Sequence, residues 1–209
     1  MTDKLVAGFG RFKRAYFGDD IALYASMKTG QPAKTLMIAC CDSRVDPAIL
    51  TDCDPGDLFT VRNVANLVPP CETDNNHHGT SSALEFAVNS LEVENIIVMG
   101  HANCGGIKAL WENEGEGDSK FIHRWVSIAQ HAKDWVKAHH PEADKSEQLK
   151  ICEQRAILVS LTNLMTFDCI SSRVENGTLS LHGWFFDLDA GELLCYKPES
   201  DSFQSPVVK

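Results

Sequence analysis

Two short stretches of the chain carry side chains that can bind a metal ion. In IACCDSR, residues 38–44, two adjacent cysteines are followed closely by an acid and an arginine. In GHANCGG, residues 100–106, His101 and Cys104 are three positions apart and two glycines follow. At a turn from a strand into a helix, this H-x-x-C spacing can aim an imidazole and a thiolate at one point. Either stretch alone is also compatible with an ordinary buried cysteine or histidine.

The alternation of an extended chain favours Cys40 over Cys41 as the ligand from the first stretch. Successive residues of a strand point to opposite faces, so Cys40, Asp42 and Arg44 share one face if the extended geometry continues. A metal bound by Cys40 would then have an acid and a cation beside it, whereas Cys41 would point away from both. We therefore expect Cys41 to be a small, inert, buried residue.

Two thiolates and one imidazole are supplied by Cys40, His101 and Cys104. Sulfur ligands favour zinc over magnesium or calcium, and a catalytic zinc has three protein ligands with a fourth position for water. A closed structural site would need one more ligand, for which the nominal candidates are Cys53, Cys71, His77 and His78. None of these has short-range C-x-x-C pairing, so we expect an open site with one Zn²⁺ per chain.

The elements that must position these residues indicate an α/β fold. Buried strands are predicted at residues 34–40, 57–62, 95–100 and 178–188, with an antiparallel edge strand at 193–197. Helices are predicted at 3–25, 47–51, 82–93, directly after 106, and over 120–139 and 146–166. Ser82 and Glu85 are expected to form a capping box at the start of the helix over 82–93.

Alternation of strands and helices is typical of a mostly parallel central sheet flanked by helices on both faces. In such sheets, ligands gather at the carboxyl ends of the strands. Both metal-binding stretches are predicted to lie at such ends. We expect a single domain over residues 1–209, with an N-terminal helical arm over 1–30 and a loose C-terminal tail over 197–209.

The composition is ordinary for a soluble globular protein, with 44% hydrophobic and 23% charged residues. A net charge of -10 repels phosphate backbones, so nucleic acid is not an expected partner. No apolar run approaches about 18 residues, so we expect no membrane span. Eight cysteines without a recognisable secretory signal indicate a reducing compartment. We expect a cytoplasmic protein and leave organelle targeting open.

Taken together, the motifs resemble those of the β-class carbonic anhydrases. CCDSR followed by GHANCGG resembles the C-x-D-x-R and H-x-x-C signature of that family. The resemblance continues through VRNVANLVPP, HHGTSSALEFAV and LHGWFFDL, and its dense part covers residues 30–110. It implies a lyase, carbonic anhydrase, that hydrates CO2 reversibly to bicarbonate and a proton by means of a zinc-bound hydroxide.

Position by position, the resemblance implies that Cys40, His101 and Cys104 are the zinc ligands and that Asp42 and Arg44 form a catalytic dyad. Asp42 would accept a hydrogen bond from the hydroxide, and Arg44 would hold Asp42 away from the metal. Because two thiolates cancel the charge of the dication, the bound water should be less acidic than at a three-histidine site. The rate is therefore expected to rise towards alkaline pH.

The resemblance also implies a substrate pocket formed by Gln31, Phe59, Val64 and Phe86 and by the backbone N–H of Gly105. The three apolar side chains suit CO2, which is small and carries no net charge. Gln31 and the N–H of Gly105 could donate hydrogen bonds to oxygen atoms of the substrate.

The family has a second, closed arrangement in which the aspartate binds zinc and a Trp–Arg–Tyr trio binds an inhibitory bicarbonate. The matching positions here are Met37, Arg62 and Phe186, so two of the three anion donors are missing. We therefore predict the plant-like, open kind of active site.

The resemblance further implies a homodimer or higher homo-oligomer in which the N-terminal helices pack on the partner. Two other functions stay open at this point. One is the hydrolysis of carbonyl sulfide or carbon disulfide on the same fold. The other is a non-catalytic regulator that binds zinc, which the intact pair of Asp42 and Arg44 disfavours.

Overall fold

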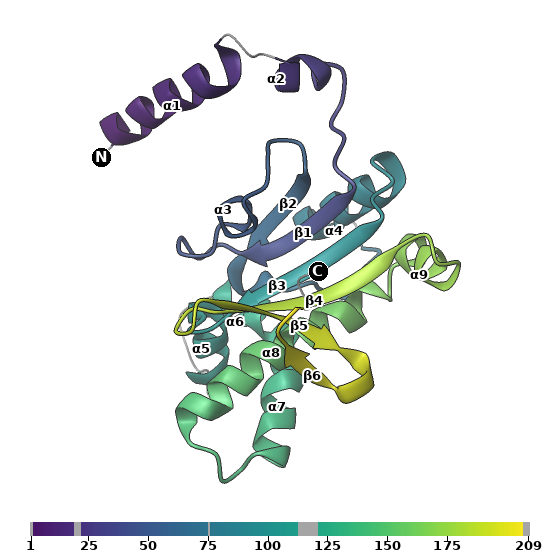
Figure 1. The fold of residues 1–209 in the computed structure, drawn as a ribbon. Coiled ribbons are helices and arrows are strands. Elements are labelled where there is room, and N and C mark those ends of the chain that lie inside the picture. Colours follow the sequence, from purple (N-terminus) through teal and green to yellow (C-terminus); the bar gives the residue numbers. More distant parts are fainter. Residues whose placement is uncertain (1, 19–21, 75, 113–120, 207–209) are drawn as a thin grey trace.

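A six-stranded sheet forms the centre of the computed structural model, which describes residues 2–18, 22–74, 76–112 and 121–206. The strand order is β2-β1-β3-β4-β5-β6 (Figure 1). The parallel strands are β1 (Thr35–Cys40), β2 (Leu58–Asn63), β3 (Asn95–His101) and β4 (Ser180–Asp187). The antiparallel edge strands are β5 (Glu192–Lys197) and β6 (Ser202–Gln204). The predicted α/β fold with a mostly parallel sheet is confirmed.

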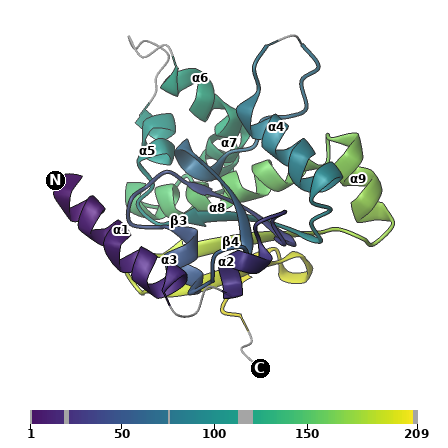
Figure 2. The same cartoon turned by 90° about the horizontal axis from the view of Figure 1, so that it is seen from above.

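Helices precede and follow the strands along the chain. They are α1 (Thr2–Phe17), α2 (Ala22–Ser26), α3 (Pro47–Thr51), α4 (Gly79–Glu85), α5 (Gly105–Glu112), α6 (Ile122–Val126), α7 (Gln130–His139), α8 (Lys145–Leu164) and α9 (Asp168–Glu175). Figure 2 shows α4, α7, α8 and α9 together on one side of the sheet. No helix in the described part of the chain is both long and apolar enough to cross a membrane.

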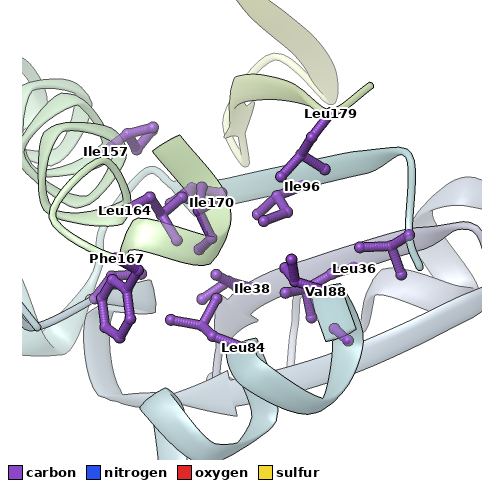
Figure 3. Close-up of a cluster of buried hydrophobic side chains, with 14 of the residues drawn as sticks. Leu36, Ile38, Leu84, Val88, Ile96, Ile157, Leu164, Phe167, Ile170 and Leu179 are labelled. Atoms are coloured by element: carbon purple, nitrogen blue, oxygen red, sulfur yellow. The ribbon is translucent and has the colours of Figure 1, made fainter. Parts of the chain in front are cut away.

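Both faces of β1 are buried, because alternate residues of this strand enter different apolar clusters. Leu36 and Ile38 belong to a large cluster that includes Ile157 and Leu164 of α8 (Figure 3). Met37 and its neighbours on the opposite face pack with β3 and with α3. Burial on both faces explains why β1 is a continuous apolar run rather than an alternating one.

Helix α8 approaches β3 and β4 closely because both strands place a glycine beneath it. A Cβ atom at Gly100 would lie 2.8 Å from Cδ1 of Ile157, and one at Gly183 would lie 3.1 Å from its Cγ2. Ile157 is fully buried between these two strands. Gly100, the residue before His101, is therefore part of the contact that sets the distance between the sheet and α8.

The sequence-based boundaries were wrong at three places. Helix α4 begins at Gly79 after His78, and the expected capping box is absent: the hydroxyl of Ser82 donates to the carbonyl oxygen of His78 at 2.8 Å. Helix α9 was not predicted. The expected loose tail contains β6, which pairs with β5, while residues 207–209 lie outside the described residues.

The N-terminal arm consists of α1 and α2, and residues 19–21 of the predicted helix over 3–25 lie outside the described residues. In Figure 1, α1 extends away from the sheet, and none of its described residues is buried. Leu5, Val6 and Phe9 are 70%, 68% and 62% exposed. Such a run of exposed apolar side chains is typical of a surface that another polypeptide covers.

We expect Ile157→Ala to lower the free energy of unfolding by about 2–5 kcal/mol, because it leaves a cavity between α8 and the two glycines. Ile157→Val removes one methylene and should cost only about 0.5–1.5 kcal/mol. Urea denaturation of both variants would measure the difference. Equal effects of the two substitutions would contradict the close contact.

Candidate metal centre

Cys40, His101 and Cys104 meet at the carboxyl edge of the sheet. Cys40 is the last residue of β1 and His101 is the last residue of β3, and these two strands are parallel neighbours. Cys104 stands directly before the first residue of α5. The side chains are 5%, 1% and 2% exposed. Three potential metal ligands are thus buried together.

The ligand atoms of these three residues all lie within 4.8 Å of one another. The Sγ atoms of Cys40 and Cys104 are 4.0 Å apart. Zinc–sulfur and zinc–nitrogen distances are about 2.3 and 2.0 Å, so one ion can reach three atoms spaced in this way.

The hydrogen bonds of His101 leave one ring nitrogen for a metal. Its Nδ1–H donates to the carbonyl oxygen of Ala102 at 2.8 Å, so that in the neutral ring Nε2 is the unprotonated nitrogen. Nε2 is buried and has no hydrogen-bond partner within the described residues. A buried polar atom without a partner is costly, so the structure at this atom fits a bound cation.

The two thiols influence each other strongly because they are in contact and buried. A hydrogen bond from the Cys104 thiol lowers the pKa of Cys40 to about 4, although burial opposes this shift. The same contact, together with burial, raises the pKa of Cys104. Without a cation, only one of the pair ionises easily. A divalent cation would stabilise both as thiolates.

Asp42 and Arg44 form a close ion pair beside the three ligands. Arg44 donates to the carboxylate from its backbone N–H and Nε, both at 2.9 Å, and from Nη2 at 2.7 Å. These bonds from Arg44 hold the pKa of Asp42 well below its usual range. Oδ2 of Asp42 lies 4.0 Å from Nε2 of His101. An ionised carboxylate therefore faces the place where the three ligand atoms converge.

Arg62 of β2 holds the backbone of the segment that follows β1. Its Nε donates to the carbonyl oxygen of Cys40 at 2.9 Å, and its Nη2 donates to that of Asp42 at 2.7 Å. Its Nη1 pairs with Asp46 at 2.7 Å, and Asp46 caps α3. The sequence singled out Arg62 only as the remaining member of the anion-binding trio. In the structure, each of the three guanidinium nitrogens of Arg62 donates a hydrogen bond to a protein oxygen.

Cys41 is exposed, so the prediction that it is buried was wrong. Strand β1 ends at Cys40, and only the backbone N–H of Cys41 continues the pairing, by donating to the carbonyl oxygen of Asn63 at 2.9 Å. Because the chain turns after this bond, the side chain of Cys41 faces solvent. Cys40 is the cysteine that joins His101 and Cys104.

Glu153 was not predicted from the sequence as a residue of the site. In the structure it lies next to Cys104. It comes from α8, is 6% exposed, and accepts a hydrogen bond from the backbone N–H of Cys104 at 2.8 Å. Burial raises the pKa of Glu153 to about 7, although hydrogen bonds from the backbone oppose this shift. An acid within the buried stripe of a helix was the one signal that could have indicated it.

The structure brings together some of the residues predicted to bind substrate. The rings of Phe59 and Phe86 have centroids 5.7 Å apart, and Phe86 is 44% exposed. Val64 follows β2 and contacts the start of α5, where Gly105 is exposed. Val64 thus lies beside the start of α5, whereas Phe59 stands opposite Leu36, four positions before Cys40 in β1.

Gln31 lies at the opposite end of β1 from Cys40. It is exposed in the segment that leads from α2 to β1, at the amino end of that strand (Figure 1). Cys40 stands at the carboxyl end, and a six-residue strand spans about 20 Å. Gln31 therefore does not join the metal centre of its own chain.

The family model described as carbonic anhydrase matches residues 35–193 of the chain. Beta carbonic anhydrase 5 of Arabidopsis thaliana, named as chloroplastic, is 45% identical over 186 residues. That alignment covers 88% of this chain, but the chain spans only 61% of the length of this relative.

Solved structures agree with this match. The β-carbonic anhydrase CcaA, whose structure is solved, is 32% identical to this chain in sequence. The two structures match with a TM-score of 0.92, over 100% of this chain and 93% of that chain. A tetrameric β-carbonic anhydrase of Sordaria macrospora is 26% identical, with a TM-score of 0.73 over 93% and 92% of the two chains.

The fold and the buried Cys–His–Cys group define an α/β protein with a candidate metal centre, and the comparisons place it in a family. The chain belongs to the β-carbonic anhydrase family. β-Carbonic anhydrases are zinc enzymes, and the ligand types gathered here suit zinc.

The two glycines after Cys104 should differ sharply in their tolerance of a side chain. A Cβ atom at Gly106 would lie 2.7 Å from Cγ1 of Val64 and 2.8 Å from Cβ of Ala65, whereas nothing lies within 4 Å of one at Gly105. We expect Gly106→Ala to cost about 1–3 kcal/mol of unfolding free energy through overpacking. Gly105→Ala should be neutral or stabilising by up to about 1 kcal/mol, because alanine favours a helix.

Urea denaturation of the metal-free variants would test this difference. Equal stability of the two variants would contradict the close approach of α5 to Val64 and Ala65.

Proposed function

We propose that this chain catalyses the reversible hydration of CO2 to bicarbonate and a proton, with one zinc ion per chain held by Cys40, His101 and Cys104. The observation that carries the proposal is the convergence of three buried ligand atoms beside an ionised carboxylate. Membership of the β-carbonic anhydrase family supports it. When bound there, zinc would lower the pKa of a water molecule, which makes hydroxide available near neutral pH.

The roles of the three ligands follow from their environments. Nε2 of His101 would bind the metal, because the hydrogen bond from Nδ1 to Ala102 fixes the tautomer and the orientation of the ring. The thiolates of Cys40 and Cys104 would neutralise the charge of the dication. This neutralisation moderates the acidity of the water, so activity should rise towards alkaline pH.

Asp42 is proposed to orient the nucleophile. Its carboxylate can only accept hydrogen bonds, and one oxygen lies close to the imidazole of His101. Arg44 binds both carboxylate oxygens and also donates to the carbonyl oxygen of Asn103 at 3.1 Å. Arg44 thereby ties Asp42 to the turn that carries Cys104. This arrangement supports the open, plant-like kind of site, in which Asp42 does not bind the metal.

The substrate is proposed to contact the apolar surface of Phe59, Val64 and Phe86 and the N–H of Gly105. Phe86 and Val64 are exposed within one chain, which suits a pocket completed by a second chain. Since Gln31 lies far from the metal ligands of its own chain, we propose that Gln31 reaches the site of the partner. The enzyme would then be a homodimer or a higher homo-oligomer.

The two alternative functions, hydrolysis of sulfur-containing gases and non-catalytic regulation, are not favoured by the comparisons. A cytoplasmic location stays a prediction, since the Arabidopsis relative is named as chloroplastic.

We expect Cys40→Ser to lose stoichiometric zinc and to reduce CO2 hydration to the uncatalysed rate, because it removes a buried ligand. The matched control is Cys41→Ser, which should retain zinc and activity because Cys41 is exposed. Stopped-flow assays from mildly acidic to alkaline pH and metal analysis of the same samples would measure both. The rate of the wild-type protein should rise smoothly with pH.

Other results would change the assignment. Full zinc content without CO2 hydration at any pH would contradict the proposed activity, and a parallel assay with carbonyl sulfide would then test the sulfur-gas hydrolase. Loss of zinc in Cys41→Ser but not in Cys40→Ser would contradict the ligand set. A steep collapse of the rate at lower pH would contradict the open arrangement, since it would indicate that Asp42 binds the metal.

For assembly, we expect the double substitution Leu5→Asp and Phe9→Asp to dissociate the oligomer. Both side chains lie on one face of α1 and are exposed within the single chain, so burying two charges there would be strongly unfavourable. Sedimentation velocity would report the change in mass. Arg11→Asp, on the opposite face of α1, is the control that should leave the assembly intact. An unchanged mass of the double variant would contradict the role of α1.

A further inference from the structure

A buried acid lies against the metal centre without contributing a ligand atom. Glu153 sits in the part of α8 that packs into the core, where the neighbouring residues Cys152, Ala156 and Ile157 are also fully or nearly fully buried. Burying a carboxylate is costly unless hydrogen bonds compensate it. An acid at this position therefore calls for a physical reason.

The partner of Glu153 is the backbone of a metal ligand rather than a side chain. Its Oε1 accepts a hydrogen bond from the N–H of Cys104 at 2.8 Å. Cys104 stands immediately before the first residue of α5, so its N–H finds no acceptor within that helix. Glu153 supplies the acceptor that the helix lacks.

The rest of the turn from His101 to Cys104 is held by other contacts. The N–H of Ala102 donates to the carbonyl oxygen of Phe186 at 2.9 Å, and the carbonyl oxygen of Ala102 accepts from His101. Asn103 has a φ of 58°, in the left-handed region, and its carbonyl oxygen accepts from Arg44. The bond to Glu153 is thus the contact that fixes the amide of Cys104 itself.

We infer that Glu153 is a positioning residue for the metal: by holding the amide of Cys104, it aims the Cys104 thiolate at the point shared with Cys40 and His101. The inference rests on the proposed zinc site. The sulfur is joined to the amide nitrogen through only Cα and Cβ, so a shift of the amide moves the sulfur directly. Glu153 acts through geometry, and an uncharged side chain with an oxygen acceptor in the same place should serve nearly as well.

The surroundings of Glu153 decide which variants can test this role. A cavity of about 280 Å³ borders Cys104 and Glu153 and is also lined by Lys108 and Lys150. A small residue at 153 would let water from this cavity take the place of the carboxylate. Leucine fills a similar volume and offers no acceptor, whereas glutamine keeps an oxygen acceptor without the charge.

The test is zinc affinity, measured by competition with a chelator, in full-length wild-type, Glu153→Gln and Glu153→Leu proteins. We expect Glu153→Leu to bind zinc about 10–100-fold more weakly and Glu153→Gln to stay within about threefold of wild type. Cobalt-substituted protein gives a second measurement. The thiolate-to-cobalt absorption should be preserved in Glu153→Gln and altered in Glu153→Leu.

Asp187→Asn is the matched control for a merely structural effect. Asp187 is 7% exposed and accepts hydrogen bonds from the backbone N–H groups of Asp189 and Ala190 at 3.0 and 3.2 Å. It has no hydrogen bond to a metal ligand within the described residues. This variant should lower thermal stability and leave zinc affinity and the cobalt spectrum unchanged. If Glu153→Leu does not fold, Glu153→Met replaces it with the same expected result.

Wild-type zinc affinity and an unaltered cobalt spectrum in Glu153→Leu would overturn the inference, whatever the stability of that variant. An equal loss in Glu153→Gln and Glu153→Leu would also overturn it, because charge rather than geometry would then matter. Failure of the proposed function has a different signature. The wild-type protein would bind zinc without hydrating CO2, and the comparison of affinities would still stand.

Discussion

The parallel pairing of β1 with β3 is the constraint on which the site depends. It places the last residues of both strands, Cys40 and His101, at the same edge of the sheet. The turn after β3 then returns Cys104 to that edge before α5 begins. The glycines beneath Ile157 set how closely α8 approaches the strands, and α8 carries the acid behind the site. The convergence of the three candidate ligands is therefore a consequence of strand order.

The metal centre is held mainly through its backbone. Arg62 binds the carbonyl oxygens of Cys40 and Asp42, while Arg44 binds that of Asn103. Glu153 binds the N–H of Cys104. A site held in this way costs little reorganisation when a cation binds, because the ligands are already directed inward. Nε2 of His101 has no hydrogen-bond partner among the described residues, which is the local cost of that preorganisation, and a metal ion would remove this cost.

The N-terminal arm and the predicted substrate pocket share one property, which is apolar surface exposed in the single chain. Helix α1 exposes Leu5, Val6 and Phe9, and Phe86 is nearly half exposed beside Phe59. Apolar surface of this extent is costly in water. Association of identical chains would remove both exposures at once and would join the proposed assembly to the proposed activity.

The sequence by itself predicted three metal-binding residues and most of the elements that carry them. Buried strands show as continuous apolar runs, and H-x-x-C before two glycines is a local pattern, so Cys40, His101 and Cys104 could be proposed as ligands without coordinates, and the structure brings them together. The tertiary structure alone decided that Cys41 faces solvent, that α4 begins at Gly79, and that Arg62 and Glu153 support the site. These features depend on where the chain turns and on contacts between residues far apart along it, such as the 49 positions that separate Cys104 from Glu153. Local patterns do not encode such contacts, because the folded arrangement of the whole chain produces them.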